Sequence, residues 1–129
     1  MRIPPDFRPR RVLVLRLRGL GDVVLSSAVV DALTRAYPGV AIDFLSATPA
    51  RALLEADARL DGIFLRDDDS SVREGRVQTG SRVDAVRWIR GRRPDIVVDL
   101  FSNPVTAFLT ALSGARFRIG LSKRLRALA

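Results

Sequence analysis

The chain has 129 residues, the length of one domain, and a formal net charge of +8. It contains no cysteine and no histidine, which excludes disulfides, thiolate nucleophiles, imidazole bases and the common zinc sites. No apolar run approaches the roughly 18 residues of a membrane-spanning helix, and no apolar signal segment follows the basic N-terminus, so we expect a soluble, cytoplasmic chain.

Nearly all the positive charge is arginine, with Lys123 as the only lysine. Arginine presents a planar fork of donors that matches phosphate and carboxylate oxygens, so the composition favours an acidic partner. Solvated surface charge is an equally good interpretation. The aromatic content is 6%, and the aromatic residues lie mostly in apolar runs, so we expect no nucleic-acid partner.

The first unit of the chain is a strand, a turn and a helix. Residues 1–10 carry prolines and positive charge and predict an irregular arm. Residues 12–15 are apolar and predict a buried strand, Gly19 and Gly21 predict a turn, and residues 22–36 have helical spacing. This order places Asp22 at the carboxyl end of the strand, where open α/β sheets bind ligands.

The rest of the chain alternates strands with helices. Further strands are expected at 40–45, 63–65, 95–100 and 117–121, and further helices after Thr48, at 82–92 and from Pro104, with Ser81 and Asn103 as caps. The polar stretch 66–81 is too long for an ordinary connection and predicts either a functional or a mobile loop. The alternation predicts the α/β class, with a Rossmann-like, doubly wound parallel sheet.

Apolar spacing also predicts which side of each helix is buried. The expected core positions are Leu25, Val29, Leu33 and Ala36 in the first helix, Ala52, Leu53 and Ala56 in the second, Val83, Val86 and Ile89 in the third, and Ala107, Phe108, Ala111 and Leu112 in the fourth.

Residues 19–24 partly match the dinucleotide-binding fingerprint. Gly19 and Gly21 supply its first two glycines, but Val24 stands where the third belongs. Asp43 lies at the right distance for a ribose-binding acid, yet two apolar residues follow it, so it sits inside a strand rather than at its tip. A nicotinamide or flavin site is therefore a weak alternative.

Asp22 has two interpretations. An acid in the first turn of a helix is favoured by the helix dipole and caps free N–H groups, and from spacing alone this is the better interpretation. It can instead act as a general base if an acceptor hydroxyl is held against it and desolvation restores its basicity.

Two blocks of the sequence resemble the N-terminal half of the lipopolysaccharide heptosyltransferases, glycosyltransferase family 9. The first carries R-x-x-x-x-G-D-V and A-x-P, and the second carries D-L-x-x-N and S-G-A-x-x-R-I-G. In this chain these motifs are residues 16–23, 36–38, 99–103 and 113–120. The resemblance extends from about residue 11 to residue 121.

The resemblance implies the first, acceptor-binding domain of a GT-B enzyme, in which two Rossmann-like domains face each other across a cleft. Residues 11–129 would form this domain, and the C-terminal donor-binding domain would be missing, so we expect a truncated product that is inactive alone. Asp22 matches the catalytic base of an inverting, metal-free transfer of heptose from a nucleotide sugar such as ADP-heptose. The acceptor would be the phosphorylated, acidic lipid A core at the inner membrane.

The same resemblance carries the expected substrate contacts. They are Arg18, Gly19, Gly21 and Asn103, and, for the anionic groups of the acceptor, Arg66, Arg73 and Arg76 in the stretch after the third strand. Solvated loop charge is the alternative for these three arginines. A stand-alone Rossmann-like module that binds a nucleotide or an anion without catalysis is the alternative for the whole chain.

Overall fold

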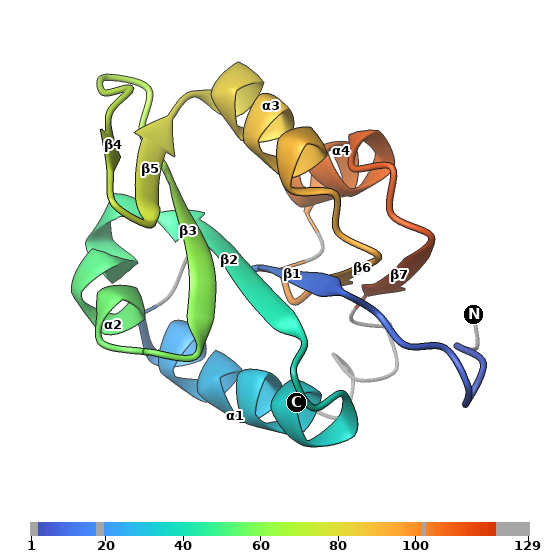
Figure 1. Cartoon of the computed structure of the whole chain (residues 1–129). Coiled ribbons are helices and arrows are strands. Elements are labelled where there is room, and N and C mark those ends of the chain that lie inside the picture. Colours follow the sequence, from blue (N-terminus) through green and yellow to red (C-terminus); the bar gives the residue numbers. More distant parts are fainter. Residues whose placement is uncertain (1–2, 18–19, 102, 121–129) are drawn as a thin grey trace.

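The computed structural model describes residues 3–17, 20–101 and 103–120, and the side chains of residues 20–25 lie outside this description. Its elements, drawn in Figure 1, are β1 (Arg11–Leu15), α1 (Leu20–Ala36), β2 (Ala41–Ala47), the short 3-10 helix η1 (Thr48–Ala50), α2 (Arg51–Glu55), β3 (Leu60–Arg66), β4 (Arg73–Glu74), β5 (Val77–Gly80), α3 (Arg82–Arg92), β6 (Ile96–Asp99), α4 (Pro104–Leu112) and β7 (Phe117–Gly120).

The strands form a single seven-stranded sheet in the order β4-β5-β3-β2-β1-β6-β7. Every neighbouring pair is parallel except β4 with β5. Helices α1 and α2 cover one face and α3 and α4 cover the other (Figure 1). The predicted α/β class with a doubly wound, Rossmann-like sheet is therefore confirmed.

The central strands are buried on both faces. Val12 and Val14 of β1 belong to the apolar layer under α1 and α2, while Leu13 and Leu15 belong to the layer under α3 and α4. The irregular segment 3–10 adds to the first layer, because Ile3 and Phe7 pack against it. This two-sided burial explains why these strands read as continuous apolar runs.

The prediction of a loop at 66–81 is wrong for its second half. Strands β4 and β5 form a hairpin, and β5 pairs with β3 through registers such as Ile63 with Val77. Gly75 in the turn has a φ of 58°, which suits a tight hairpin turn. The stretch gave no strand signal because Val77 is its single large apolar residue that reaches the core.

The predicted buried sides of the helices need correction. Small residues lie against the sheet, namely Ser26, Ala50, Ala85 and Thr106, together with Val30, Leu54, Ile89 and Leu109. Eight of the fourteen apolar residues expected inside are exposed, namely Ala36, Ala52, Leu53, Ala56, Val83, Ala107, Phe108 and Ala111. The largest of them, Leu53, Val83 and Phe108, are exposed at 43%, 61% and 47%. The buried side is turned by about one residue in two helices, since Leu54 is buried instead of Leu53 and Leu109 instead of Phe108. Apolar spacing gives the period of a helix, but the sheet decides which side of it is buried.

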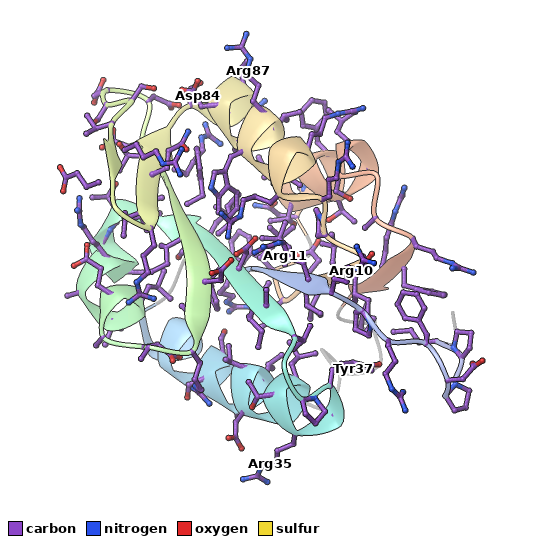
Figure 2. All side chains as sticks on the ribbon, viewed as in Figure 1. Arg10, Arg11, Arg35, Tyr37, Asp84 and Arg87 are labelled. Carbon is purple, nitrogen blue, oxygen red and sulfur yellow. The ribbon has the colours of Figure 1, made fainter. Side chains whose placement is uncertain are left out.

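Charged side chains lie mostly outside this core. Figure 2 shows Arg35 and Arg87 extending outward from the helices on the two sides of the sheet. Arg11, in contrast, is only 22% exposed, because its side chain reaches the carboxylate of Asp43. Asp43 is 1% exposed and therefore needs partners for its charge.

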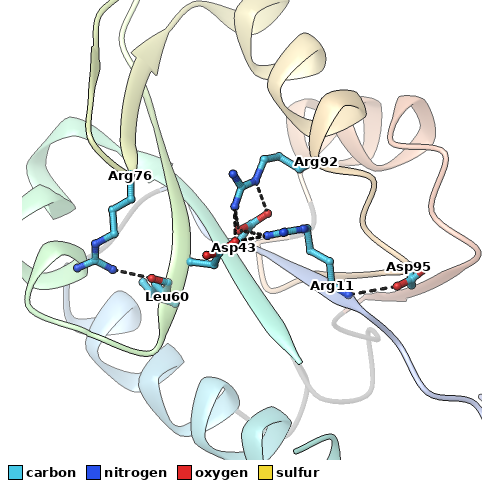
Figure 3. Close-up of polar contacts among 7 residues, drawn as sticks. Arg11, Asp43, Leu60, Arg76, Arg92 and Asp95 are labelled. Atoms are coloured by element: carbon cyan, nitrogen blue, oxygen red, sulfur yellow. Dashed lines mark hydrogen bonds and ion pairs between the residues drawn. The ribbon is translucent and has the colours of Figure 1, made fainter. Parts of the chain in front are cut away.

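Two arginines neutralise Asp43 (Figure 3). The guanidinium of Arg92 donates to both of its carboxylate oxygens, at 2.9 and 2.8 Å, and Arg11 Nη1 donates at 2.9 Å. Both arginines also bind Asp61, whose pKa is lowered chiefly by the hydrogen bond from Arg11. The hydrogen bond to Asp43 raises the pKa of Arg92. Asp43 is thus occupied inside the fold, which excludes it as a ribose ligand.

Gly62 makes room for this network, because it pairs with Asp43 in the register of β2 and β3. A Cβ atom at position 62 would lie 2.6 Å from Arg92 Nη2 and 2.9 Å from Asp43 Oδ1. Replacing Gly62 with alanine should therefore reduce the free energy of unfolding by about 1–3 kcal/mol, measured by urea denaturation. Gly91→Ala is the control, since its Cβ meets nothing within 4 Å and should stabilise α3 by up to about 1 kcal/mol. Equal stability of the two variants would contradict this account.

The network also predicts a pH dependence. The pKa of Asp61 is lower in the folded chain than in the unfolded chain. Its contribution to the free energy of unfolding is therefore present above about pH 4 and is lost as the pH falls through the folded pKa. Because its side chain is 52% exposed, we expect no more than about 1 kcal/mol. Asp61→Asn should lower stability at pH 7 and flatten its decline between about pH 5 and pH 2 in urea titrations. Asp69→Asn, which removes a carboxylate without a described partner, should leave that decline unchanged.

Candidate functional site

The carboxyl edge of the sheet is the place where the candidate residues gather. Arg16 and Leu17 follow β1, Ala47 ends β2 and Arg66 ends β3. Helices α1, α3 and α4 begin at the same edge, because each follows a strand in a parallel sheet. Free N–H groups at helix N-termini favour anions, so this edge suits a negatively charged ligand.

A cavity of about 310 Å³ opens at this edge. Its lining consists of Leu17, Ala47, Arg66, Arg82, Asn103 and Val105. Two of these residues, Arg66 and Asn103, are predicted substrate contacts, and the fold brings them together from opposite sides of β1. Arg82 was not predicted as a site residue, because an outward-facing arginine at the start of a helix gave no functional signal.

The two arginines of the cavity keep unused donors. Arg66 Nη2 lies 3.2 Å from Asp68 Oδ1, but its buried Nε has no hydrogen-bond partner in the described part of the chain. Arg82 makes neither a hydrogen bond nor an ion pair with any described residue. Guanidinium groups with spare donors bind phosphate and carboxylate oxygens in pairs. The cavity can therefore hold an oxyanion.

Asn103 caps α4, as predicted. Its side-chain oxygen accepts from the backbone N–H of Thr106 at 2.8 Å, and Thr106 Oγ1 accepts from the backbone N–H of Asn103 at 3.0 Å. This capping box fixes the start of the helix. The amide NH2 of Asn103 donates to no described residue, so it is available to a ligand in the cavity.

Arg16 ties the loop after β6 to the end of β1. Its Nη1 donates to the carbonyl of Leu100, and its guanidinium lies 5.4 Å from the centre of the Phe101 ring. At the same edge the hydroxyl of Ser46 is buried and has no partner among the described residues. Sequence reasoning did not assign a role to either residue, although each is a polar residue at the end of an apolar strand.

Arg73 and Arg76 do not join the cavity. Arg73 lies on β4, in a groove of about 340 Å³ between the hairpin and α3 that Arg87 and Trp88 also line. Arg76 Nη1 donates to the carbonyl of Leu60 at 2.7 Å, at the amino edge of the sheet (Figure 3). It also donates to the carbonyl of Asp57 at 2.9 Å. These bonds give Arg76 a structural role that its sequence position did not indicate.

Asp22 lies in the first turn of α1, because the helix begins at Leu20. The prediction that Gly21 lies in the turn before the helix is therefore wrong, because Gly21 is part of α1. Arg18 and Gly19 lie outside the described residues. The backbone thus places Asp22 at the carboxyl edge, and its choice between capping and proton transfer stays a prediction.

The described residues contain neither a metal-binding cluster nor a membrane-spanning helix. No group of three or more His, Cys, Asp or Glu residues there could hold a metal ion. No helix in the same set is long and apolar enough to cross a membrane.

Comparison with known proteins bears on the fold. No protein-family model matches the chain, and no curated protein does. Among solved structures, the chain is similar to a glycosyl transferase family 9 protein from Veillonella parvula DSM 2008, with a TM-score of 0.68 and 23% identity. The two share a fold. The match covers 88% of this chain but 32% of the other, so the 129 residues span about a third of that protein.

Substitution of Asn103 tests its role as the cap of α4. Asn103→Ala removes the cap of α4 and should lower the free energy of unfolding by about 1 kcal/mol in urea denaturation. Asn103→Ser keeps a capping oxygen and should stay within a few tenths of a kcal/mol of the parent. A loss of the same size in both variants would contradict the capping role.

Proposed function

We propose that the chain is the acceptor-binding domain of a family 9 glycosyltransferase that acts as a heptosyltransferase. The observation that carries the proposal is the structural likeness to a family 9 protein, which extends over most of the chain. The positions of the motif residues support it. Residues 16–23 and 99–103 are far apart in sequence, yet β1 pairs with β6, and Arg16 bonds to Leu100 between them.

Asp22 is the proposed general base. It would accept the proton of an acceptor hydroxyl as that oxygen attacks the anomeric carbon of a nucleotide-activated heptose such as ADP-heptose. The bond from the anomeric carbon to the diphosphate breaks as the new glycosidic bond forms, so the configuration inverts and the nucleotide diphosphate leaves. One carboxylate suffices for this displacement, and the proposed reaction uses no metal.

The cavity beside Asn103 is the proposed site for the anionic part of the acceptor. Arg66 and Arg82 would bind a phosphate or carboxylate of an acidic glycolipid, the lipid A core, and Asn103 would donate its amide hydrogens. Asp68 holds one donor of Arg66 in the free chain and would be displaced or would turn away. This assignment replaces Arg73 and Arg76 with Arg82 among the predicted anion contacts.

The proposed reaction needs a donor-binding domain that these 129 residues do not supply. In the proposal this second domain completes the enzyme, which works in the cytoplasm at the surface of the inner membrane. A stand-alone anion-binding module is the second candidate, and the spare donors of Arg66 and Arg82 in the cavity favour it.

The test is a transfer assay with the enzyme that contains both domains. Asp22→Asn should lower kcat by about 100-fold or more, because the general base is lost. Arg82→Gln should raise the KM for the acceptor several-fold and leave kcat nearly unchanged, because it removes binding that ground state and transition state share.

Asp31→Asn is the matched control, since Asp31 lies on the same helix and pairs with the exposed Arg35. Its transfer rate should equal that of the parent. Unchanged transfer by Asp22→Asn would exclude Asp22 as the base. Loss of folding in that variant, measured by circular dichroism, would instead assign Asp22 a structural role in the first turn of α1.

A further inference from the structure

A second basic cavity lies at the amino edge of the sheet, opposite the edge that carries the candidate site. It has a volume of about 310 Å³ and lies between the C-terminal ends of α3 and α4 and the start of β7. Three arginines line it, Arg90 and Arg93 from the end of α3 and Arg116 from the segment before β7.

The charge of these arginines is not balanced by carboxylates. None of the three forms an ion pair within 4.0 Å with a described residue. Asp95 also lines the cavity, but its carboxylate accepts the backbone N–H groups of Arg10 and Arg11, at 2.6 and 3.1 Å. Three guanidinium groups and one carboxylate thus line the cavity, which leaves an excess of positive charge. A bound anion would offset this excess.

Two of the guanidinium groups are held in place by uncharged contacts. Arg116 lies over the rings of Phe7 and Phe117, at 5.4 and 5.5 Å, and these rings pack edge to face at 4.8 Å. Arg90 Nη1 donates to the carbonyl of Leu112 at 3.4 Å. These contacts restrain each side chain and leave most of its N–H donors free. Restrained donors bind a ligand with a smaller loss of conformational entropy.

The backbone of Arg93 adds an independent observation. Arg93 ends α3 in the left-handed conformation, with φ 54° and ψ 61°, and it is the one described non-glycine residue with a positive φ. Glycine is the residue that this position favours, because a Cβ atom is strained there. The side chain of Arg93 makes no hydrogen bond to a described residue, so the fold itself does not explain why arginine stands there. Outliers of this kind occur at functional sites.

We propose that this cavity is a binding site for a phosphate group, separate from the candidate substrate site. Its size accommodates a phosphate with a small organic body. The carbonyl ends of α3 and α4 oppose an anion here, but they are partly satisfied, since Arg93 N–H donates to Ile89 and Arg90 donates to Leu112. The phosphate can belong to a small phosphate monoester or to a lipid headgroup, which share the same recognition chemistry.

The test is a titration of the 129-residue chain with inorganic phosphate, glycerol phosphate and vesicles that contain phosphatidic acid, followed by backbone amide NMR. Arg93→Gly is the decisive variant, because it removes the cation and places the favoured residue in the left-handed position. We expect saturable shifts at Gly114 and Arg116, at least about 5-fold weaker binding in Arg93→Gly, and a thermal midpoint that does not fall. Arg116→Gln should weaken binding to a similar degree.

Two controls separate this site from general charge effects. Arg35 is 81% exposed and extends from α1 away from the sheet (Figure 2), so Arg35→Gln should change the affinity by less than about 2-fold. Arg82→Gln tests the cavity at the carboxyl edge and should also leave these shifts unchanged. Tighter binding of glycerol phosphate than of vesicles would identify a soluble ligand, and the reverse would identify a headgroup.

Phosphate binding by Arg93→Gly equal to that of the parent would overturn the proposal. An equal loss in Arg35→Gln would also overturn it, because net charge would then explain the binding. Loss in Arg82→Gln alone would assign the phosphate to the carboxyl edge and exclude a second site. None of these readings depends on glycosyl transfer.

Discussion

The rest of the structure depends on the position of β1 between β2 and β6 in the sheet. It pairs with β2 on one side and β6 on the other, and all three strands run parallel. Successive parallel strands require crossover helices, so every helix that follows a strand begins at the carboxyl edge. The two motif blocks share that edge for this reason, although about eighty residues separate Arg16 from Leu100. A local sequence pattern becomes a site only through this pairing.

Much of this fold could be predicted because its signals are local. The caps Ser81 and Asn103 and the apolar runs of β1, β2 and β6 each depend on neighbouring residues, and the structure places these elements within one or two residues of the expected bounds. Strand β5 could not be predicted in this way, since its burial depends on pairing with β3 and not on its own composition. The prediction of the helix faces was wrong for a related reason, because apolar spacing does not fix which side of a helix meets the sheet, and Ala85 and Leu109 are buried while Val83 and Phe108 are exposed.

The residues of the candidate site were likewise predictable where their signal is local and not where it depends on distant parts of the chain. Asn103 was predictable as a cap, and Arg66 as the first residue after an apolar strand. Arg82 was not, because its function depends on a cavity whose other walls come from β2, β3 and α4. Asp43 shows the converse case. It resembles a ribose ligand in sequence, yet Arg11 and Arg92, 32 and 49 residues away, neutralise it inside the fold. Spacing describes the position of a charge and says nothing of its partner.

Net charge therefore says little until each arginine is assigned a partner. Arg76 and Arg93 both lie at the amino edge, where helices end and their carbonyl groups attract cations. Arg76 binds the carbonyls of Glu55, Asp57 and Leu60, so the fold accounts for it fully. The side chain of Arg93 binds no described residue, and its backbone adopts a conformation that arginine disfavours. The carbonyl groups at this edge explain the position of Arg76, but no contact within the described fold explains that of Arg93. The proposed phosphate site gives Arg93 a function, so the amino edge would bind a ligand as well as close the end of the sheet.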